Sequence, residues 1–160
     1  MKTWSGNDQR GPWTYTVGSG DAVADSWDFR GSPTGAYDLT VYGPNGFMRA
    51  FKGSLADRDQ TNLDVRTLYD PDHNDITLEI HNRGLRLSDL SIASLYTKDR
   101  TVQRLQPGET VKRRFRADAS FGWYDLTLTV AGDPGFQQRF AGHIETGGDS
   151  VSDPALGAAG

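Results

Sequence analysis

Apolar and polar residues alternate with a period of two along most of the chain. In residues 75–82, apolar Ile76, Leu78 and Ile80 alternate with polar side chains, and residues 122–131 repeat the pattern. Such alternation is typical of strands that bury one face. Turn-forming runs rich in Pro, Gly, Asp and Asn separate the apolar runs. We therefore predict strands near residues 62–69, 75–82, 90–97, 101–106, 110–117, 122–131 and 135–145.

Seven short strands with regular turn signals, within about 90 residues, indicate an all-β fold. Their number and spacing favour an antiparallel, immunoglobulin-like β-sandwich. The order in which the strands pair cannot be derived from this pattern.

A part of the sequence occurs twice. Residues 37–53 resemble residues 124–142, and residues 20–23 resemble residues 108–111, which lie 88 positions later. The matching runs are Tyr37-Asp38-Leu39-Thr40-Val41 with Tyr124-Asp125-Leu126-Thr127-Leu128, and Gly46-Phe47-Met48-Arg49-Ala50-Phe51-Lys52-Gly53 with Gly135-Phe136-Gln137-Gln138-Arg139-Phe140-Ala141-Gly142. Self-similarity at a fixed spacing indicates one structural unit present twice.

The two copies predict a division of the chain into three parts. Residues 1–55 form a truncated first copy, residues 56–157 a complete second copy, and residues 158–160 a disordered tail. The first copy supplies only its later strands, near residues 13–17, 22–29, 36–42 and 46–53. So few strands bury little surface alone.

We therefore expect the first copy to pack on the second, or to extend one of its sheets. The expected contact uses apolar strand faces that include Trp27 and Tyr37. Otherwise the first copy would expose Trp13, Tyr15, Trp27 and Phe29.

Composition excludes several classes of protein. The 160 residues contain no cysteine, so the chain has no disulfide and no thiolate metal site. The net charge of −4 argues against a nucleic-acid-binding protein, which usually carries a basic surface. The first residues contain no apolar run, so we expect no signal peptide within this chain.

The run from Tyr37 to Gly53 resembles a signature of bacterial phosphocholine-type phospholipases C, both haemolytic and non-haemolytic. The end of the chain is similar to the end of the same family, in three successive runs: Gly122-Trp123-Tyr124-Asp125-Leu126-Thr127, then Arg139-Phe140-Ala141-Gly142-His143-Ile144-Glu145-Thr146-Gly147, then Ser150-Val151-Ser152-Asp153-Pro154-Ala155-Leu156-Gly157. In that family, a phosphoesterase domain is followed by tandem C-terminal repeats. The resemblance covers nearly the whole chain, but the phosphoesterase domain is absent from it.

The resemblance implies a non-catalytic accessory module of an enzyme that hydrolyses phosphatidylcholine-type lipids. The implied partner is the phosphoesterase catalytic domain of the parent phospholipase C, which is secreted or periplasmic. We expect no catalytic residue, cofactor or metal site in this chain. Two alternatives stay open: an autonomous module that binds a lipid surface or a carbohydrate, and a hydrolase in its own right.

The sequence around Phe47 is the first candidate contact site. Phe47, Met48 and Arg49 follow the turn signal Pro44-Asn45-Gly46, so they are candidates for an apolar and cationic loop tip that contacts lipid or the missing catalytic domain. The alternative is that this run simply builds a tight hairpin, because Asn-Gly tolerates positive φ.

A basic strand is the second candidate. Lys112, Arg114 and Arg116 alternate along residues 110–117, so they share one face, while Val111 and Phe115 point to the core. Three cations together are suited to an anionic lipid surface or an acidic partner. A solvated sheet edge that resists aggregation explains the same pattern.

Catalytic and metal-binding patterns are weak. The three histidines are scattered, and the nearest approach to a metal-ligand pattern is His143, Glu145 and Asp149. We expect hydrogen-bonding roles for the histidines. No serine lies in a Gly-x-Ser-x-Gly elbow, and no glycine run has the lysine of a phosphate-binding loop.

Overall fold

The computed structural model describes residues 3–5, 13–18, 20–28, 34–55 and 60–157. Its elements are β1 (Thr3–Ser5), β2 (Ser26–Asp28), β3 (Ala36–Tyr42), β4 (Met48–Ser54), β5 (Leu63–Asp70), β6 (Asp75–Asn82), β7 (Ser88–Ser94), β8 (Arg100–Leu105), β9 (Thr110–Arg116), β10 (Trp123–Val130) and β11 (Asp133–His143), with short 3₁₀ helices at Asp118–Ser120 and Pro154–Gly157.

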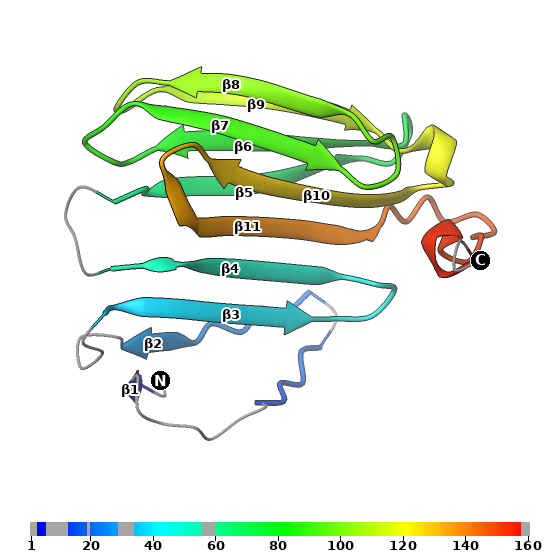
Figure 1. The fold of residues 1–160 in the computed structure, drawn as a ribbon. Coiled ribbons are helices and arrows are strands. Elements are labelled where there is room, and N and C mark those ends of the chain that lie inside the picture. Colours follow the sequence, from blue (N-terminus) through cyan, green and yellow to red (C-terminus); the bar gives the residue numbers. More distant parts are fainter. Residues whose placement is uncertain (1–2, 6–12, 19, 29–33, 56–59, 158–160) are drawn as a thin grey trace.

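Two antiparallel sheets pack face to face (Figure 1). The larger has six strands in the order β3-β4-β11-β10-β7-β8, and the smaller has three in the order β5-β6-β9. The all-β sandwich predicted from the sequence is therefore confirmed. The immunoglobulin-like connectivity is a finer statement and stays a prediction.

The core lies between the two sheets. In β6, Ile76, Leu78 and Ile80 are fully buried, and the side chains between them are half-buried. The period-two pattern therefore identified the inward face of this strand correctly. Facing residues from the six-stranded sheet complete the core, among them Leu90, Ile92, Leu126, Leu128, Phe136 and Phe140.

The strands of the second copy lie close to their predicted positions, with ends that differ by up to three residues. The predicted strand at 90–97 runs instead from Ser88 to Ser94. Residues 95–97 form a turn, in which the Ser94 N–H donates to Asp99 O at 3.0 Å and Lys98 has a φ of 57°. This chain reversal ends the strand before its apolar run does.

Two predictions for the first copy are wrong. Residues 13–17 form no strand, although their side chains alternate, and Trp13 and Tyr15 stay 38% and 43% exposed. Alternation alone does not make a strand where the backbone has no neighbouring strand to pair with. In place of the predicted strand at 22–29, only Ser26–Asp28 is a strand, and it pairs in parallel with β1. The Trp27 side chain, Phe29 and the tail 158–160 lie outside the described residues.

The first copy joins the second by extending its sheet. β4 pairs with β11 in antiparallel fashion over five residue pairs centred on Ala50 and Arg139, which places β3 at the sheet edge. On the inner face of this junction, the rings of Phe51 and Phe140 meet edge to face, with centroids 6.3 Å apart. The expected sheet extension is thus observed, and Tyr37 is half-buried beside it.

The junction is symmetric with respect to the repeat. In the alignment of the two copies, Met48 to Lys52 correspond to Gln137 to Ala141. Within the ladder, Arg49 pairs with Phe140 and Phe51 pairs with Gln138, so exchanging the two copies reproduces the same register about the central pair. The hairpins β3–β4 and β10–β11 are therefore related by a pseudo-two-fold axis between β4 and β11.

A second shared detail supports this relation. Tyr37 is the register partner of Gly53, and the corresponding Tyr124 is the partner of Gly142. A Cβ atom on Gly142 would lie 2.7 Å from the Tyr124 hydroxyl, and one on Gly53 would collide with the Tyr37 hydroxyl. In both hairpins, the glycine makes room for the ring on the neighbouring strand.

Removal of residues 1–55 should destabilise the remaining chain. It would expose the backbone edge of β11 and the Phe140 ring, which is 2% exposed in the intact chain. An open, apolar edge strand promotes association. We expect a lower melting temperature and self-association, measured by thermal denaturation and size-exclusion chromatography. A monomer with an unchanged melting temperature would contradict this prediction.

Candidate functional site

The β3–β4 hairpin ends in a two-residue turn formed by Asn45 and Gly46. The Phe47 N–H donates to Pro44 O at 3.0 Å, and the two central residues have φ values of 53° and 70°. Two positive φ angles define a type I′ turn, for which Asn-Gly is the preferred sequence. The tight hairpin predicted from the sequence is confirmed.

Arg49 does not project from this turn. Its side chain points inward and is 8% exposed, whereas Phe47 is 37% exposed and Met48 is half-buried. The expectation that Phe47, Met48 and Arg49 form one exposed loop tip is therefore wrong for Arg49. The physical reason is the strand periodicity, which begins at Met48 and turns Arg49 toward β5 and β10.

Hydrogen bonds hold the buried Arg49 guanidinium from several elements. Its Nη1 donates to Met48 O at 2.7 Å and to Ala141 O at 2.9 Å. Its Nη2 donates to the Tyr124 hydroxyl at 3.1 Å and also to the Tyr69 hydroxyl. No local sequence signal marks Tyr69 for this role, because only the packing of the two sheets brings the end of β5 to this position.

Aromatic rings enclose the same guanidinium. Its central carbon lies 4.3 Å from the ring centroid of Phe47, 5.4 Å from that of Phe140 and 5.7 Å from that of Tyr124. Cations over ring faces are attracted by the ring quadrupole, more strongly where water is excluded. Arg49 thus couples the hairpin tip to both sheets.

A cavity of about 410 Å³ opens beside this cluster. Its walls come from the hairpin tip, the end of β5 and the segment that follows β11, and most of the lining atoms are apolar: Pro44, Asn45, Phe47, Tyr69, Pro71, Tyr124, Gly142, His143, Ile144 and Glu145. We call it the hairpin-tip cavity. Its volume falls within the range of about 300–1,000 Å³ that small-molecule sites occupy.

The two phenols form a hydrogen-bonded pair in the wall of this cavity. The Tyr69 and Tyr124 hydroxyl oxygens lie 3.0 Å apart, and each accepts a hydrogen bond from Arg49. Burial raises the pKa of Tyr124 above its ordinary value of 10.0, and the bond to Tyr69 raises it further, whereas Arg49 acts in the opposite direction. Tyr124 therefore keeps its proton throughout the physiological pH range.

The raised pKa of Tyr124 predicts a loss of stability at alkaline pH. Above pH 10, the unfolded chain releases this proton while the folded chain still holds it, so the free energy of unfolding falls as the pH rises. Tyr124→Phe should make this fall shallower and should cost about 1 kcal/mol at neutral pH. Urea denaturation from pH 8 to pH 11 measures both effects.

The control is Tyr42→Phe, at a ring that is 78% exposed, which should leave the dependence of the unfolding free energy on pH unchanged. An equal slope for wild type and Tyr124→Phe would contradict the prediction.

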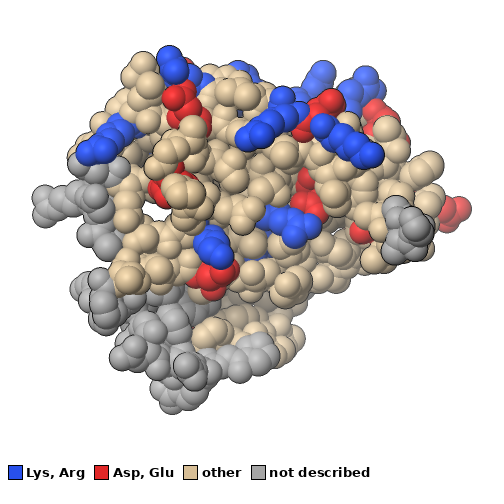
Figure 2. All heavy atoms as spheres, in the orientation of Figure 1, with Lys and Arg blue, Asp and Glu red and all other residues tan. Residues whose placement is uncertain are grey.

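The basic strand predicted from the sequence is β9, and its three cations lie on the outer face of the smaller sheet. Lys112, Arg114 and Arg116 are exposed, while Val111 and Phe115 pack against the core, as the alternation predicted. On the face of the molecule that Figure 2 shows, Lys and Arg side chains are interspersed with Asp and Glu. A contact between these cations and lipid or a partner stays a prediction.

Each of the three cations has a carboxylate partner. Lys112 Nζ lies 2.8 Å from Glu79 Oε2, Arg114 Nη1 lies 3.4 Å from Asp75 Oδ2, and Arg116 Nη2 lies 2.8 Å from Asp118 Oδ2. The bond to Lys112 lowers the pKa of Glu79. These carboxylates neutralise much of the charge that a membrane surface would attract.

Arg114 differs from its two neighbours because its partner is buried. The Asp75 side chain is 4% exposed, whereas those of Glu79 and Asp118 are 27% and 49% exposed. We expect Arg114→Gln to cost about 1 kcal/mol, because a buried carboxylate then loses its cation. Lys112→Gln should stay within about 0.5 kcal/mol. Chemical denaturation at pH 7 measures the two values. Equal losses would contradict this account.

The histidines make hydrogen bonds, as expected from the sequence. His73 Nδ1 lies 2.8 Å from Asp70 Oδ2, and His81 Nδ1 lies 2.8 Å from Thr110 Oγ1. His143 Nε2 lies 2.9 Å from Phe121 O, and its Nδ1 lies 3.3 Å from Glu145 Oε1. Within residues 3–5, 13–18, 20–28, 34–55 and 60–157, no group of three or more His, Cys, Asp or Glu side chains is placed to hold a metal ion.

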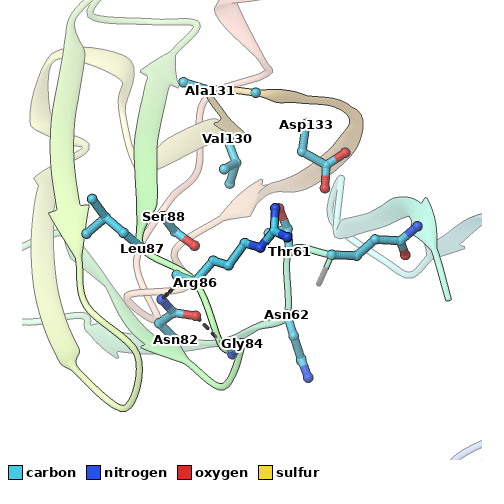
Figure 3. A pocket seen from close by; sticks show the side chains of 12 residues that line it. Thr61, Asn62, Asn82, Gly84, Arg86, Leu87, Ser88, Val130, Ala131 and Asp133 are labelled. Carbon is cyan, nitrogen blue, oxygen red and sulfur yellow. Dashed lines mark hydrogen bonds between the residues drawn. The ribbon is translucent and has the colours of Figure 1, made fainter. Parts of the chain in front are cut away.

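A second cavity, of about 410 Å³, lies near the β6–β7 turn and has a mostly polar lining (Figure 3). Arg86 extends across it in the direction of Thr61 and Asp133. At its floor, Asn82 is fully buried: its Nδ2 donates to Arg86 O at 2.8 Å, and its Oδ1 accepts from the Gly84 N–H at 2.9 Å. Asn82 therefore shapes the turn, and this cavity is the weaker candidate.

Among the described residues, no helix is long and apolar enough to cross a membrane.

Three known proteins resemble this chain in sequence. It is 39% identical over 158 residues to a non-hemolytic phospholipase C from Burkholderia pseudomallei. This alignment covers 97% of this chain and 22% of that protein. It is 34% identical over 152 residues to a non-hemolytic phospholipase C from Pseudomonas aeruginosa, and 32% identical over 161 residues to a hemolytic phospholipase C from the same organism. Each of these alignments covers 91% of this chain and 22% of the relative. The chain thus spans about a fifth of the length of these relatives.

A family model described as "Bacterial phospholipase C, C-terminal domain" matches residues 4–54 and 63–143. One matched stretch falls in each of the two copies predicted from the sequence. The family resemblance derived from the sequence motifs is thereby confirmed. The chain belongs to the family of bacterial phospholipase C C-terminal domains.

Proposed function

We propose that this chain is a non-catalytic accessory domain that supports or positions the phosphoesterase domain of a phospholipase C. The family match carries this proposal, because it covers most of the chain but only 22% of the length of the related enzymes. The remaining length of those relatives leaves room for a separate catalytic domain. The parent enzyme would hydrolyse phosphatidylcholine-type lipids and would act outside the cell or in the periplasm.

The described side chains support a non-catalytic role. The histidines have structural partners: Asp70 for His73, Thr110 for His81, and Phe121 O for His143. Hydrolysis by a nucleophile needs a base within hydrogen-bond reach of it, and the sequence has no nucleophile elbow. The purified chain should therefore release no phosphocholine from phosphatidylcholine above background.

The rigid joining of the two copies also supports this proposal. The two copies share one continuous sheet through β4 and β11, so they form one body rather than two linked modules. We propose the division into a partial first copy at 1–55 and a complete second copy at 56–157 on this basis. The symmetric register of the ladder supports it.

The accessory role predicts how a relative behaves without this domain. Removing the matching segment from the non-hemolytic enzyme of Burkholderia pseudomallei should shorten the half-life of its activity at elevated temperature several-fold. The effect should be the same for a soluble phosphocholine ester and for phosphatidylcholine vesicles, because the lost function is support of the catalytic domain.

The comparison of the two substrates separates the alternatives. Loss of activity on vesicles alone would favour a lipid-binding module, and binding of the isolated chain to a polysaccharide would favour a carbohydrate-binding one. An unchanged half-life and unchanged activity on both substrates would contradict the supporting role. The residues proposed to contact a lipid surface or the catalytic domain are Phe47 and Met48 at the hairpin, with Lys112, Arg114 and Arg116 on β9.

A further inference from the structure

The hairpin-tip cavity has a counterpart across the pseudo-two-fold axis. This counterpart is a third cavity, of about 240 Å³, and is lined by Tyr37, Ser54, Leu55, Phe136 and Gln138, among others. In the alignment of the copies, these residues correspond to Tyr124, His143, Ile144, Phe47 and Arg49. The repeat therefore builds two related cavities from equivalent positions.

The two cavities differ in charge at one equivalent position. Arg49 lies behind the walls of the hairpin-tip cavity, and Gln138 lies in the wall of its counterpart, 7% exposed. Because a neutral amide occupies this position in the second copy, the hairpin architecture does not itself require a cation. A buried charge is costly unless it is compensated, so its presence on one side calls for a specific reason.

Within the described part of the chain, no carboxylate compensates Arg49. Its hydrogen bonds go to two carbonyl oxygens and two phenols, and within the described part of the chain it forms no ion pair. Both phenols line the cavity, as does the Phe47 ring that stacks on the guanidinium. The positive charge therefore acts on the cavity through side chains that form its wall.

The phenol pair leaves one proton to donate. Each hydroxyl accepts from Arg49, and one of them donates to the other, so the second has no acceptor among the described residues. Tyr124 is 5% exposed and Tyr69 is 44% exposed. A buried hydroxyl that failed to donate would lose more free energy, which favours donation from Tyr124 to Tyr69 and leaves the Tyr69 O–H available to a further acceptor.

We propose that the hairpin-tip cavity binds a small amphiphilic anion, which places a carboxylate or phosphate-ester oxygen on the Tyr69 hydroxyl near Arg49 and its apolar part against Phe47, Pro71 and Ile144. The uncompensated guanidinium selects the negative charge, and the apolar lining selects the hydrocarbon. Glu145, whose side chain is 58% exposed, lies at the rim beside His143, where solvent screens its repulsion of the anion. This inference is independent of the accessory role.

Isothermal titration calorimetry of the full chain tests the proposal. The probes are octanoate, octyl phosphate, octyltrimethylammonium and inorganic phosphate, each below its micellar concentration. We expect saturable binding of octanoate, octyl phosphate or both, and at least about tenfold weaker binding of the cationic amphiphile and of inorganic phosphate. A difference between octanoate and octyl phosphate shows which oxyanion the site prefers. Equal binding of the octyl cation, or no binding of either octyl anion, would overturn the proposal.

Arg49→Gln places at this position the residue that its counterpart already has. It should lower the affinity for the bound anion at least tenfold and leave the chain folded. Lys52→Gln is the matched control, because it removes one positive charge from an exposed site on the same strand. In the wild type, Lys52 Nζ lies 3.1 Å from Asp38 Oδ2. Lys52→Gln should leave the affinity unchanged, and equal losses in the two variants would refute a role for Arg49.

Tyr69→Phe keeps the test decisive if Arg49→Gln proves unstable. Tyr69 is 44% exposed, so the loss of its hydroxyl should leave the chain folded. We expect a several-fold weaker affinity for the anion, because the donor is removed while Arg49 stays in place. Unchanged affinity in a folded Tyr69→Phe variant would contradict the proposed binding geometry.

Discussion

The ladder between β4 and β11 is the interaction on which the rest of this structure depends. It joins the first copy to the second through five backbone pairs and brings Phe51 against Phe140 on the inner face. Without it, β3 and β4 would be an isolated hairpin, which is marginally stable in water. With it, the partial copy becomes two further strands of a sheet that already has a core.

The symmetry of that ladder has a functional consequence. Equivalent residues of the two copies occupy equivalent places around the axis, so each copy serves as a reference for the other. Where the copies agree, as with the glycines opposite Tyr37 and Tyr124, the fold explains the residue. Where they differ, as with Arg49 and Gln138, the fold alone does not explain it, and a ligand or partner becomes the more informative explanation.

Buried charge and exposed charge carry different information in this domain. The cations of β9 are exposed and each has a carboxylate neighbour, so their contribution to any surface contact is screened. Arg49 is buried among aromatic rings and phenols without such a neighbour in the described chain. A single uncompensated charge in a region of low dielectric acts more strongly than several paired charges in water.

The sequence by itself determined the all-β class, most strands of the second copy, the tight hairpin at Asn45-Gly46 and the family. These features follow from local physics: period-two burial, the positive φ that Asn45 and Gly46 tolerate, and motifs contiguous in the chain. Only the tertiary structure decided that residues 13–17 form no strand, because a strand needs a partner that the local sequence does not specify. It also decided that Arg49 turns inward and meets Tyr69, since the packing of two sheets brings together residues that are distant in sequence.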